Sequence, residues 1–258
     1  MINIINLDES NIQTLTNYLY TVFDNLNSLN IRIIFSDNLY DDAIRYCDNK
    51  SYKSQLLAMT VANQDYCRKL NGLYLYPETI TSKQMILVST HQLKDGYSFF
   101  STAVHEIQHV LNHQFFIAKY CNNNVEDIYN HPYRFSFSVC DEFFARKKGH
   151  SSFLYVHSRL ENLNKQEVTN ILYLKELPLR LAKLRSLKES GKSFEKIADI
   201  SAILGILSVW EEEYNIDLNG LDAWNQILYE AINKYKSIKD VNFEEIEATL
   251  QLQFKNKL

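Results

Sequence analysis

The chain is poor in glycine and cysteine and has no long apolar run. Six glycines in 258 residues leave little room for the glycine-rich loops that bind phosphate groups. No segment reaches the roughly 18 consecutive apolar residues of a membrane span, so no membrane partner is expected. The cysteines show no C-x-x-C spacing and predict reduced, mostly buried thiols of a cytosolic protein; they are Cys47, Cys67, Cys121 and Cys140.

An excess of positive charge is also missing. The formal net charge is -4, and basic and acidic side chains are mixed along the chain, which argues against nucleic acid as an obligatory partner. The first residues have neither the basic segment nor the apolar core of a secretory signal. We therefore expect a cytoplasmic protein. Delivery by a dedicated secretion system would leave little trace in composition and stays open.

The most informative motif lies in residues 101–113, which read S-T-A-V-H-E-I-Q-H-V-L-N-H. On a helix that turns about 100° per residue, His105 and His109 project about 40° apart and one turn apart, close enough to bind one metal ion. Glu106 then points to the side of that ion, as a general base for a metal-bound water must. Chance would produce this pattern in roughly one of a hundred chains of this composition. The alternative is an ordinary amphipathic helix.

A catalytic zinc ion needs a third protein ligand, which must come from elsewhere. In a continuous helix His113 lies about 12 Å along the axis from His105, too far for bonds of about 2 Å to one ion. Glu142 is the favoured candidate, because it borders an apolar stripe at helical spacing and a cation would offset the cost of burying its carboxylate. Three other ligands remain open: His131, Asp141 and Glu126.

These residues resemble the gluzincins, thermolysin-like zinc metallopeptidases in which H-E-x-x-H on one helix is joined by a glutamate from a following helix. The segment 141–146, D-E-F-F-A-R, is similar to the glutamate-bearing helix of that family, and the resemblance covers residues 85 to about 149. The resemblance implies that Glu106 is the general base. It also implies three Zn²⁺ ligands, which are His105, His109 and Glu142.

One position departs from the family pattern. Many members carry an aspartate four residues after the ligand glutamate, where it orients a ligand histidine. This chain has Arg146 at that position. Support for the histidine must then come from another residue, and Asp141 is the nearest acidic option.

The chemistry expected of such a site is hydrolysis of a peptide bond. Zinc lowers the pKa of a bound water toward about 7, Glu106 takes the proton, and the hydroxide attacks a carbonyl carbon polarised by the metal. The oxyanion needs a further donor, which related enzymes place beyond the glutamate-bearing helix. Tyr155 and His157 are the predicted donors, with His150 and Tyr133 behind them.

Residues 1–157 predict an α+β, zincin-like metallopeptidase domain with a small mixed sheet and an active-site helix. The hydrophobic pattern predicts helices at 12–29 and 40–47 and strands at 31–35, 73–76 and 85–90. Residues 56–62 read as a strand, whereas 57–70 could equally form a helix, and Asn71-Gly72 resembles a hairpin turn. By the resemblance, strand 85–90 borders the cleft and hydrogen-bonds an extended substrate. The alternative is a core strand.

The limits of the two key helices follow from local signals. No glycine or proline interrupts residues 97–121, Asp95-Gly96 supplies a break before them, and Ser98 or Ser101 could cap the start. Asn130-His131-Pro132 predicts a turn before a helix that begins near residue 133. Gly149 is the expected end of that helix.

Residues 158–258 predict a helical subdomain that packs on the first domain. Apolar residues at threes and fours mark helical stretches at 161–188, 194–214, 221–235 and 243–254. Pro178 should kink or split the first of these. Residues 197–210 loosely suggest a helix-turn-helix, but the nearby Glu211-Glu212-Glu213 would repel phosphate, so DNA binding is not expected.

The sequence as a whole favours a zinc-dependent metalloendopeptidase that hydrolyses a protein or peptide. An intracellular regulatory protease that cleaves a repressor is one form of it. The competing hypothesis is a non-catalytic partner-binding protein with a structural or vestigial metal site. A closed metal shell without a bound water would favour that second hypothesis.

Overall fold

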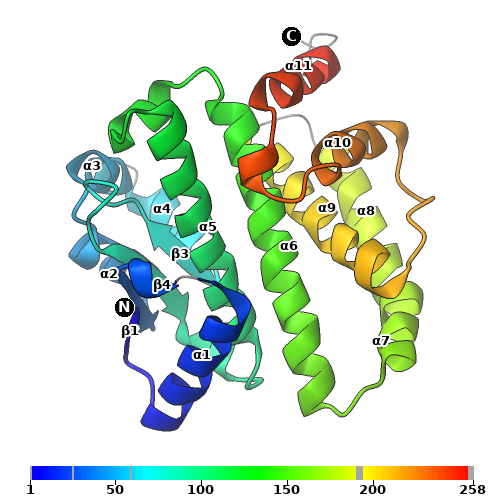
Figure 1. Cartoon of the computed structure of the whole chain (residues 1–258), viewed down its shortest axis with the longest axis horizontal. Coiled ribbons are helices and arrows are strands. Elements are labelled where there is room, and N and C mark those ends of the chain that lie inside the picture. Colours follow the sequence, from blue (N-terminus) through cyan, green and yellow to red (C-terminus); the bar gives the residue numbers. More distant parts are fainter. Residues whose placement is uncertain (1, 25, 59, 190–193, 255–258) are drawn as a thin grey trace. The chain divides into compact units, whose positions relative to one another are not determined.

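The computed structural model describes residues 2–24, 26–58, 60–189 and 194–254. The chain divides into two compact units, Met1–Asn130 and His131–Leu258 (Figure 1). The boundary predicted after residue 157 falls instead inside a long helix of the second unit, α6 (Arg134–Leu160). A first unit with a sheet and a second, helical unit agree with the α+β class predicted from the hydrophobic pattern.

A four-stranded mixed sheet forms the centre of the first unit. Its strands have the spatial order β1-β2-β4-β3; β1, β2 and β4 are parallel, and β3 runs antiparallel to β4. The bounds are β1 (Ile2–Ile5), β2 (Ile31–Ser36), β3 (Gly72–Leu75) and β4 (Gln84–Ser89). The strands predicted at 31–35, 73–76 and 85–90 are confirmed. Strand β1 is not predicted from the sequence, because a segment of four residues is too short to show a hydrophobic period.

Strand β4 lies inside the sheet, so the prediction that it borders a cleft and binds substrate was wrong. It pairs with β2 on one side and β3 on the other, and all six of its residues are buried. Its backbone groups are therefore used by neighbouring strands. A nearly continuous apolar run fits a strand that is covered on both faces. Within the described part of the first unit, β3 and β1 are the strands at the ends of the sheet.

Helices cover both faces of this sheet (Figure 1). On one face Phe99 of α5 (Ser98–Tyr120) contacts Phe35 of β2, and Phe100 contacts Tyr18 of α1 (Glu9–Val22). On the other face a cluster of buried side chains joins the sheet to α2 (Leu39–Tyr46), α3 (Lys50–Ala58) and α4 (Thr60–Cys67). Alternation along β4 supplies both cores, because successive side chains point to opposite faces. The short helices η1 (Leu26–Ser28), η2 (Thr90–Leu93) and η3 (Val125–Asn130) complete the unit.

The segment between α2 and β3 is helical, so the strand at 56–62 and the hairpin turn at Asn71-Gly72 are both corrected. Helix α4 precedes this dipeptide, and Gly72 is the first residue of β3. The apolar run misleads because much of it is not in the core: Leu57 is 50% exposed and Val61 is 74% exposed. An isolated apolar run does not distinguish a strand from a helix.

Helix α5 begins where the sequence predicts, but a different residue caps it. Gly96 has a φ of 75°, and the preceding Asp95 accepts hydrogen bonds from the backbone N–H groups of Tyr97 and Ser98. A carboxylate at this position satisfies N–H groups that the first turn leaves without partners. The serine caps proposed from the sequence are thus replaced by Asp95.

The described residues of the second unit form helices and no strand. After α6 come α7 (Lys165–Ile171), the π-helical turn η4 (Leu172–Glu176), α8 (Leu177–Glu189), α9 (Phe194–Tyr214), α10 (Ala223–Asn233), η5 (Ile238–Asp240) and α11 (Phe243–Phe254). The predicted helical stretches are confirmed. The separator expected at Ser190-Gly191 lies outside the described residues.

Three local signals in this unit act differently from the sequence-based expectation. Gly149 is buried within α6, which continues to Leu160, so it does not end the helix. The stretch that contains Pro178 is divided, as predicted, but by the π-helical turn η4, which ends two residues before the proline, while α8 begins at Leu177. The segment 197–210 lies within one continuous helix, α9, so it forms no helix-turn-helix.

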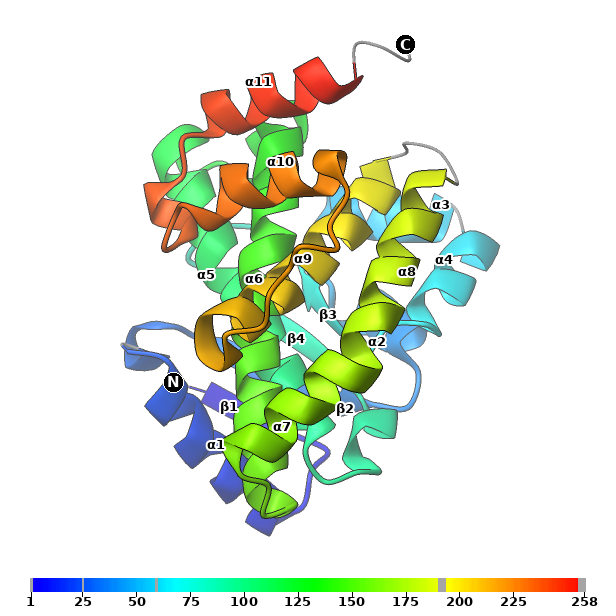
Figure 2. The ribbon, with the colours of Figure 1, turned by 90° about the vertical axis from the view of Figure 1, so that its right-hand side faces the viewer.

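Helices α6 and α9 pack closely along their length (Figure 2). The Ser201 hydroxyl donates to the Val139 carbonyl at 2.5 Å, and Gly205 lies against the backbone of Phe143. The acidic run at the end of α9 accepts hydrogen bonds from side chains of the same unit. Glu211 accepts from Tyr229, Glu212 from Lys147 and Glu213 from Ser151. The acidic run therefore takes part in the hydrogen bonding of the second unit, whereas the sequence alone indicates only a surface that repels phosphate.

The four cysteines are free and buried, as predicted. Burial raises the pKa of the Cys140 thiol well above its usual range, which fits a core thiol. Among the described residues, no helix combines the length and the apolar character that crossing a membrane requires.

Candidate metal centre

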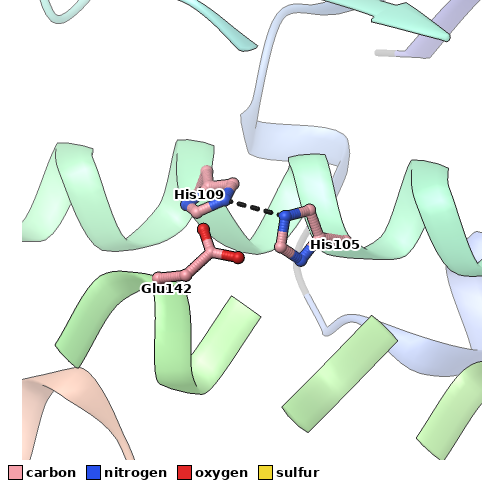
Figure 3. A group of neighbouring side chains, drawn as sticks. All are labelled: His105, His109 and Glu142. Atoms are coloured by element: carbon pink, nitrogen blue, oxygen red, sulfur yellow. Dashed lines mark hydrogen bonds between the residues drawn. The ribbon is translucent and has the colours of Figure 1, made fainter. Parts of the chain in front are cut away.

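Helix α5 presents two imidazole rings to one another across a single turn (Figure 3). The Nε2 atoms of His105 and His109 are 3.0 Å apart, and the ring centroids are 4.5 Å apart with the planes at 85°. Two nitrogens that bind one tetrahedral zinc ion at about 2.0–2.1 Å are about 3.3 Å apart. The side-chain geometry of the pair therefore needs little adjustment to bind a metal ion.

Glu106 lies on the side of α5 that faces the sheet. Its Oε1 is 3.9 Å from His105 Nε2, beyond hydrogen-bonding distance, and the residue is buried. A carboxylate in this position is close to the histidine pair without being part of it. Because desolvating a carboxylate costs free energy, its location beside two imidazoles suggests a chemical role more than a packing role.

Gly72 makes the space that Glu106 occupies. A Cβ atom on Gly72 would lie 2.8 Å from Glu106 Oε1 and 2.7 Å from Thr102 Cγ2, both closer than real Cβ contacts. Glycine therefore allows β3 to approach α5 this closely with both side chains in place, whereas any larger residue would displace them. This role could not be predicted from the sequence, because the contact joins residues 34 positions apart and the dipeptide Asn71-Gly72 resembles a turn.

His113 is one turn beyond His109 on the same helix and is buried. Its ring packs edge-on against Tyr74 and Tyr76, with centroid distances of 5.5 Å and 5.0 Å. The ring centroid of His113 is 6.4 Å from that of His109, against 4.5 Å for the His105–His109 pair. The helix rise separates it from His105, as the sequence argument requires.

Glu142 lies on α6 and therefore belongs to the second unit (Figure 3). Within that unit, its Oε1 accepts a hydrogen bond from Arg146 Nη2 at 3.2 Å, and its side chain is 23% exposed. The neighbouring Asp141 is buried. Glu142 and the histidine pair belong to different units, and the role of Glu142 as third ligand stays a prediction.

The other two ligand candidates have ordinary local settings. His131 accepts a hydrogen bond from the Tyr133 backbone N–H through Nδ1, at 3.1 Å. Glu126 is exposed in η3, where its backbone N–H donates to the Asn124 side chain. Neither contact indicates a metal ligand.

Tyr155 and His157 lie on the same helix as Glu142, because α6 does not end at Gly149. A rise of 1.5 Å per residue puts Tyr155 about 20 Å along the axis from Glu142, and His157 about 22 Å. Side chains that far apart cannot reach one metal ion, so these two residues cannot stabilise an oxyanion at a site built on Glu142. Tyr155 instead packs under the Arg159 guanidinium, and His157 stacks on Phe153.

His150, the reserve candidate, is a partly buried structural residue. Trp210 Nε1 donates to its Nε2 at 2.7 Å. Burial, together with the positive charges of Arg180 and Arg146, lowers the pKa of His150 from 6.5 to about 3. The ring is therefore neutral at physiological pH and accepts the indole hydrogen bond.

The depressed pKa of His150 predicts a loss of stability in acid. Between pH 6.5 and 3 the unfolded chain binds a proton at this position and the folded chain does not, so acid favours unfolding. Because of His150, we expect the free energy of unfolding to fall by about 2.5 kcal/mol when the pH is lowered from 7 to 4.5. Urea unfolding at both pH values should show this difference for the wild type and not for His150→Gln. Equal pH dependence in the two proteins would contradict the assignment.

Comparisons of the chain with protein-family models, with curated proteins and with solved structures gave no match. The site must therefore be argued from its own side chains.

Proposed function

We propose that the chain is a zinc-dependent endopeptidase that cleaves a protein or peptide substrate. The observation that carries the proposal is the pairing of His105 and His109 through Nε2 atoms 3.0 Å apart, with the buried Glu106 carboxylate 3.9 Å from the first of them. Two neighbouring imidazoles with a carboxylate beside them supply two metal ligands and a general base for metal-assisted hydrolysis.

The chemical nature of the available donors supports a zinc site. His105 and His109 offer two imidazoles from α5, and their ring centroids are closer than those of His109 and His113, at 4.5 Å against 6.4 Å. Glu142 of α6 is the proposed third ligand. Two imidazoles and one carboxylate leave a fourth position for water, as in catalytic zinc sites.

The proposed mechanism assigns one task to each side chain. Zinc, when bound, would supply an activated water and polarise the substrate carbonyl. The Glu106 carboxylate would accept a proton from the nucleophilic water and return it to the leaving amine. Gly72 and Thr102 restrict the carboxylate to one side of the histidine pair, so Glu106 is held as a base and does not become a ligand.

An extended peptide would bind along β3, which replaces β4 as the proposed substrate strand. The Ser89 backbone N–H donates to the Asn71 carbonyl at 2.8 Å, so in the alternating antiparallel ladder Leu73 and Leu75 also bond to β4. The backbone groups of Gly72 and Tyr74 then point away from β4. Because Gly72 touches Glu106, a peptide that pairs with this edge would pass beside the proposed base.

Metal analysis of purified variants tests the ligand set. We expect one zinc ion per chain in the wild type and none retained after dialysis in His109→Ala, because one imidazole cannot hold the ion alone. Glu142→Ala should bind zinc at least about 100-fold more weakly. His91→Ala, which removes an exposed histidine of the first unit, is the matched control and should bind like the wild type.

The outcomes separate the alternatives. A wild-type protein without stoichiometric metal would overturn the proposal. Loss of zinc in His109→Ala alone, with Glu142→Ala unchanged, would move the third ligand to another side chain and would leave the histidine pair in place.

A further inference from the structure

We propose that a cavity in the second unit binds a free α-amino acid with an apolar side chain. The cavity has a volume of about 280 Å³ and lies where the end of α6, the start of α7 and the end of α9 meet (Figure 1). It is lined by Ser158, Leu163, Lys165, Val168, Glu213 and Tyr214. All of them belong to the second unit, so binding here requires neither the histidine pair nor a metal ion. Ligand pockets usually span about 300–1,000 Å³, so this cavity suits a small ligand.

The turn from α6 to α7 gives the cavity a fixed wall. Asn162 has a φ of 53°, and the backbone N–H of Leu163 donates to the Ser158 carbonyl at 2.8 Å, which is the pattern of a Schellman motif. Asn164 then caps α7 through a capping box with Glu167. Because both helix ends are fixed by these bonds, little backbone ordering is needed when a ligand binds, which lowers the cost of binding.

Two of the lining side chains are apolar. Val168 is buried and lies three residues after Lys165 on α7, so the two side chains share one side of that helix. Leu163 follows the left-handed residue of the Schellman motif, where an apolar side chain is common. An apolar group of the ligand that covers these two side chains would remove hydrocarbon from water, at about 25 cal/mol per Å².

Two further lining side chains carry opposite charges and are not paired with each other. Within the described part of the unit, the Lys165 ammonium lies over the Tyr214 ring, 5.9 Å from its centroid. The Glu213 carboxylate accepts a hydrogen bond from the Ser151 hydroxyl at 2.6 Å. A cation and an anion that line one small cavity without forming an ion pair can each bind a ligand group of the opposite sign.

An α-amino acid carries both of the groups that this arrangement requires. Its carboxylate would pair with Lys165 and its ammonium with Glu213. A simple anion would face the carboxylate of Glu213 as well as the ammonium of Lys165, and a simple amine would meet the converse repulsion. A zwitterion places an opposite charge beside each side chain. The apolar contacts of Leu163 and Val168 then favour a ligand with a hydrocarbon side chain, such as leucine.

Equilibrium dialysis of the full-length protein with isotope-labelled L-leucine tests the cavity. A metal chelator is present throughout, so that an amino acid held by a metal ion is not counted. We expect one molecule to bind per chain with a Kd of roughly 0.1–1 mM, because the ligand is small and both charges are near solvent. Lys165→Met and Glu213→Gln should each weaken binding at least about tenfold. Lys183→Met, which removes an exposed lysine of α8, is the matched control and should bind like the wild type.

Ligand analogues test the two charges in the unchanged protein. L-leucinamide lacks the carboxylate and N-acetyl-L-leucine lacks the ammonium, so each should compete with L-leucine at least about tenfold more weakly than L-leucine itself. L-serine keeps both charges but lacks the hydrocarbon, and it should also compete more weakly.

Three results would overturn the proposal. The first is the absence of saturable L-leucine binding at millimolar concentrations. The second is equal competition by L-leucinamide or N-acetyl-L-leucine, since a ligand with one charge would then be sufficient. The third is an unchanged affinity in both Lys165→Met and Glu213→Gln, which would place the ligand outside this cavity.

Discussion

Glu106→Gln is expected to lower peptide hydrolysis by about 10²- to 10⁴-fold, the range that a general base contributes. Glutamine has nearly the same shape and fits the space left by Gly72, so the fold and the histidine pair should be unchanged. It cannot accept the proton of the nucleophilic water. Zinc content should therefore equal that of the wild type, and the loss should lie in kcat.

The measurement compares the turnover of an unstructured protein substrate with zinc content in the same preparation. Glu78→Gln, which changes an exposed carboxylate in the same unit, is the control for a general effect of charge. Undiminished hydrolysis in Glu106→Gln would remove the general base from the proposed mechanism. Loss of zinc along with activity would show that Glu106 supports the metal.

Gly72→Ala approaches the same carboxylate from the strand. The new methyl group would overlap Glu106 and Thr102, whose side chains can rotate away, so the protein should fold. The carboxylate would then leave its place beside His105. We expect a smaller loss of turnover than in Glu106→Gln, roughly tenfold to 100-fold, with zinc content unchanged. A stability change without a change in turnover would assign Gly72 to packing alone.

These variants also show which parts of the site could be predicted from the sequence. The spacing of His105 and His109 and the absence of glycine and proline around them are local, and the structure has both on one helix with adjacent nitrogens. Gly72 could not be predicted, because its role depends on a strand and a helix that meet only in the folded unit. Local signals report backbone preference, and a close tertiary approach is outside their reach.

The error about Tyr155 and His157 has a similar cause. Glycine is common at helix ends, so the sequence predicts that the helix ends at Gly149. That use of glycine requires a positive φ, and Gly96 is the only glycine among the described residues that has one. Gly149 is instead buried within α6, where tertiary packing overrides its low helix propensity. Once the helix continues, both residues are carried far from Glu142.

The sheet shows the corresponding limit for the fold. The apolar run of β4 was sufficient to predict a strand, and its six buried residues agree. Its position between β2 and β3 was not readable, because the order of strands depends on pairing between distant segments. The substrate edge was therefore assigned to the wrong strand. A continuous apolar run favours an interior strand, and the position of β4 between β2 and β3 agrees with that signal.

Gly205→Ala is expected to destabilise the second unit by about 3 kcal/mol. A Cβ atom at Gly205 would lie 2.4 Å from the Phe143 carbonyl oxygen and 3.2 Å from the Lys147 backbone nitrogen. Backbone atoms inside a helix cannot rotate away as a side chain can. Helices α6 and α9 would have to separate, which costs packing along their whole contact.

Urea unfolding gives the measurement, and Gly220→Ala is the matched control. A Cβ atom at Gly220 would meet Leu181 Cδ1 at 2.6 Å, but that methyl group ends a flexible side chain, so we expect a loss below about 1 kcal/mol. Equal midpoints for the two variants would contradict the close packing of α9 on α6. The comparison also bears on the site, because Phe143 follows Glu142 directly. The contact between Gly205 and Phe143 thus holds the turn of α6 that carries Glu142, the proposed third ligand. We therefore expect Gly205→Ala to weaken zinc binding even where the chain remains folded.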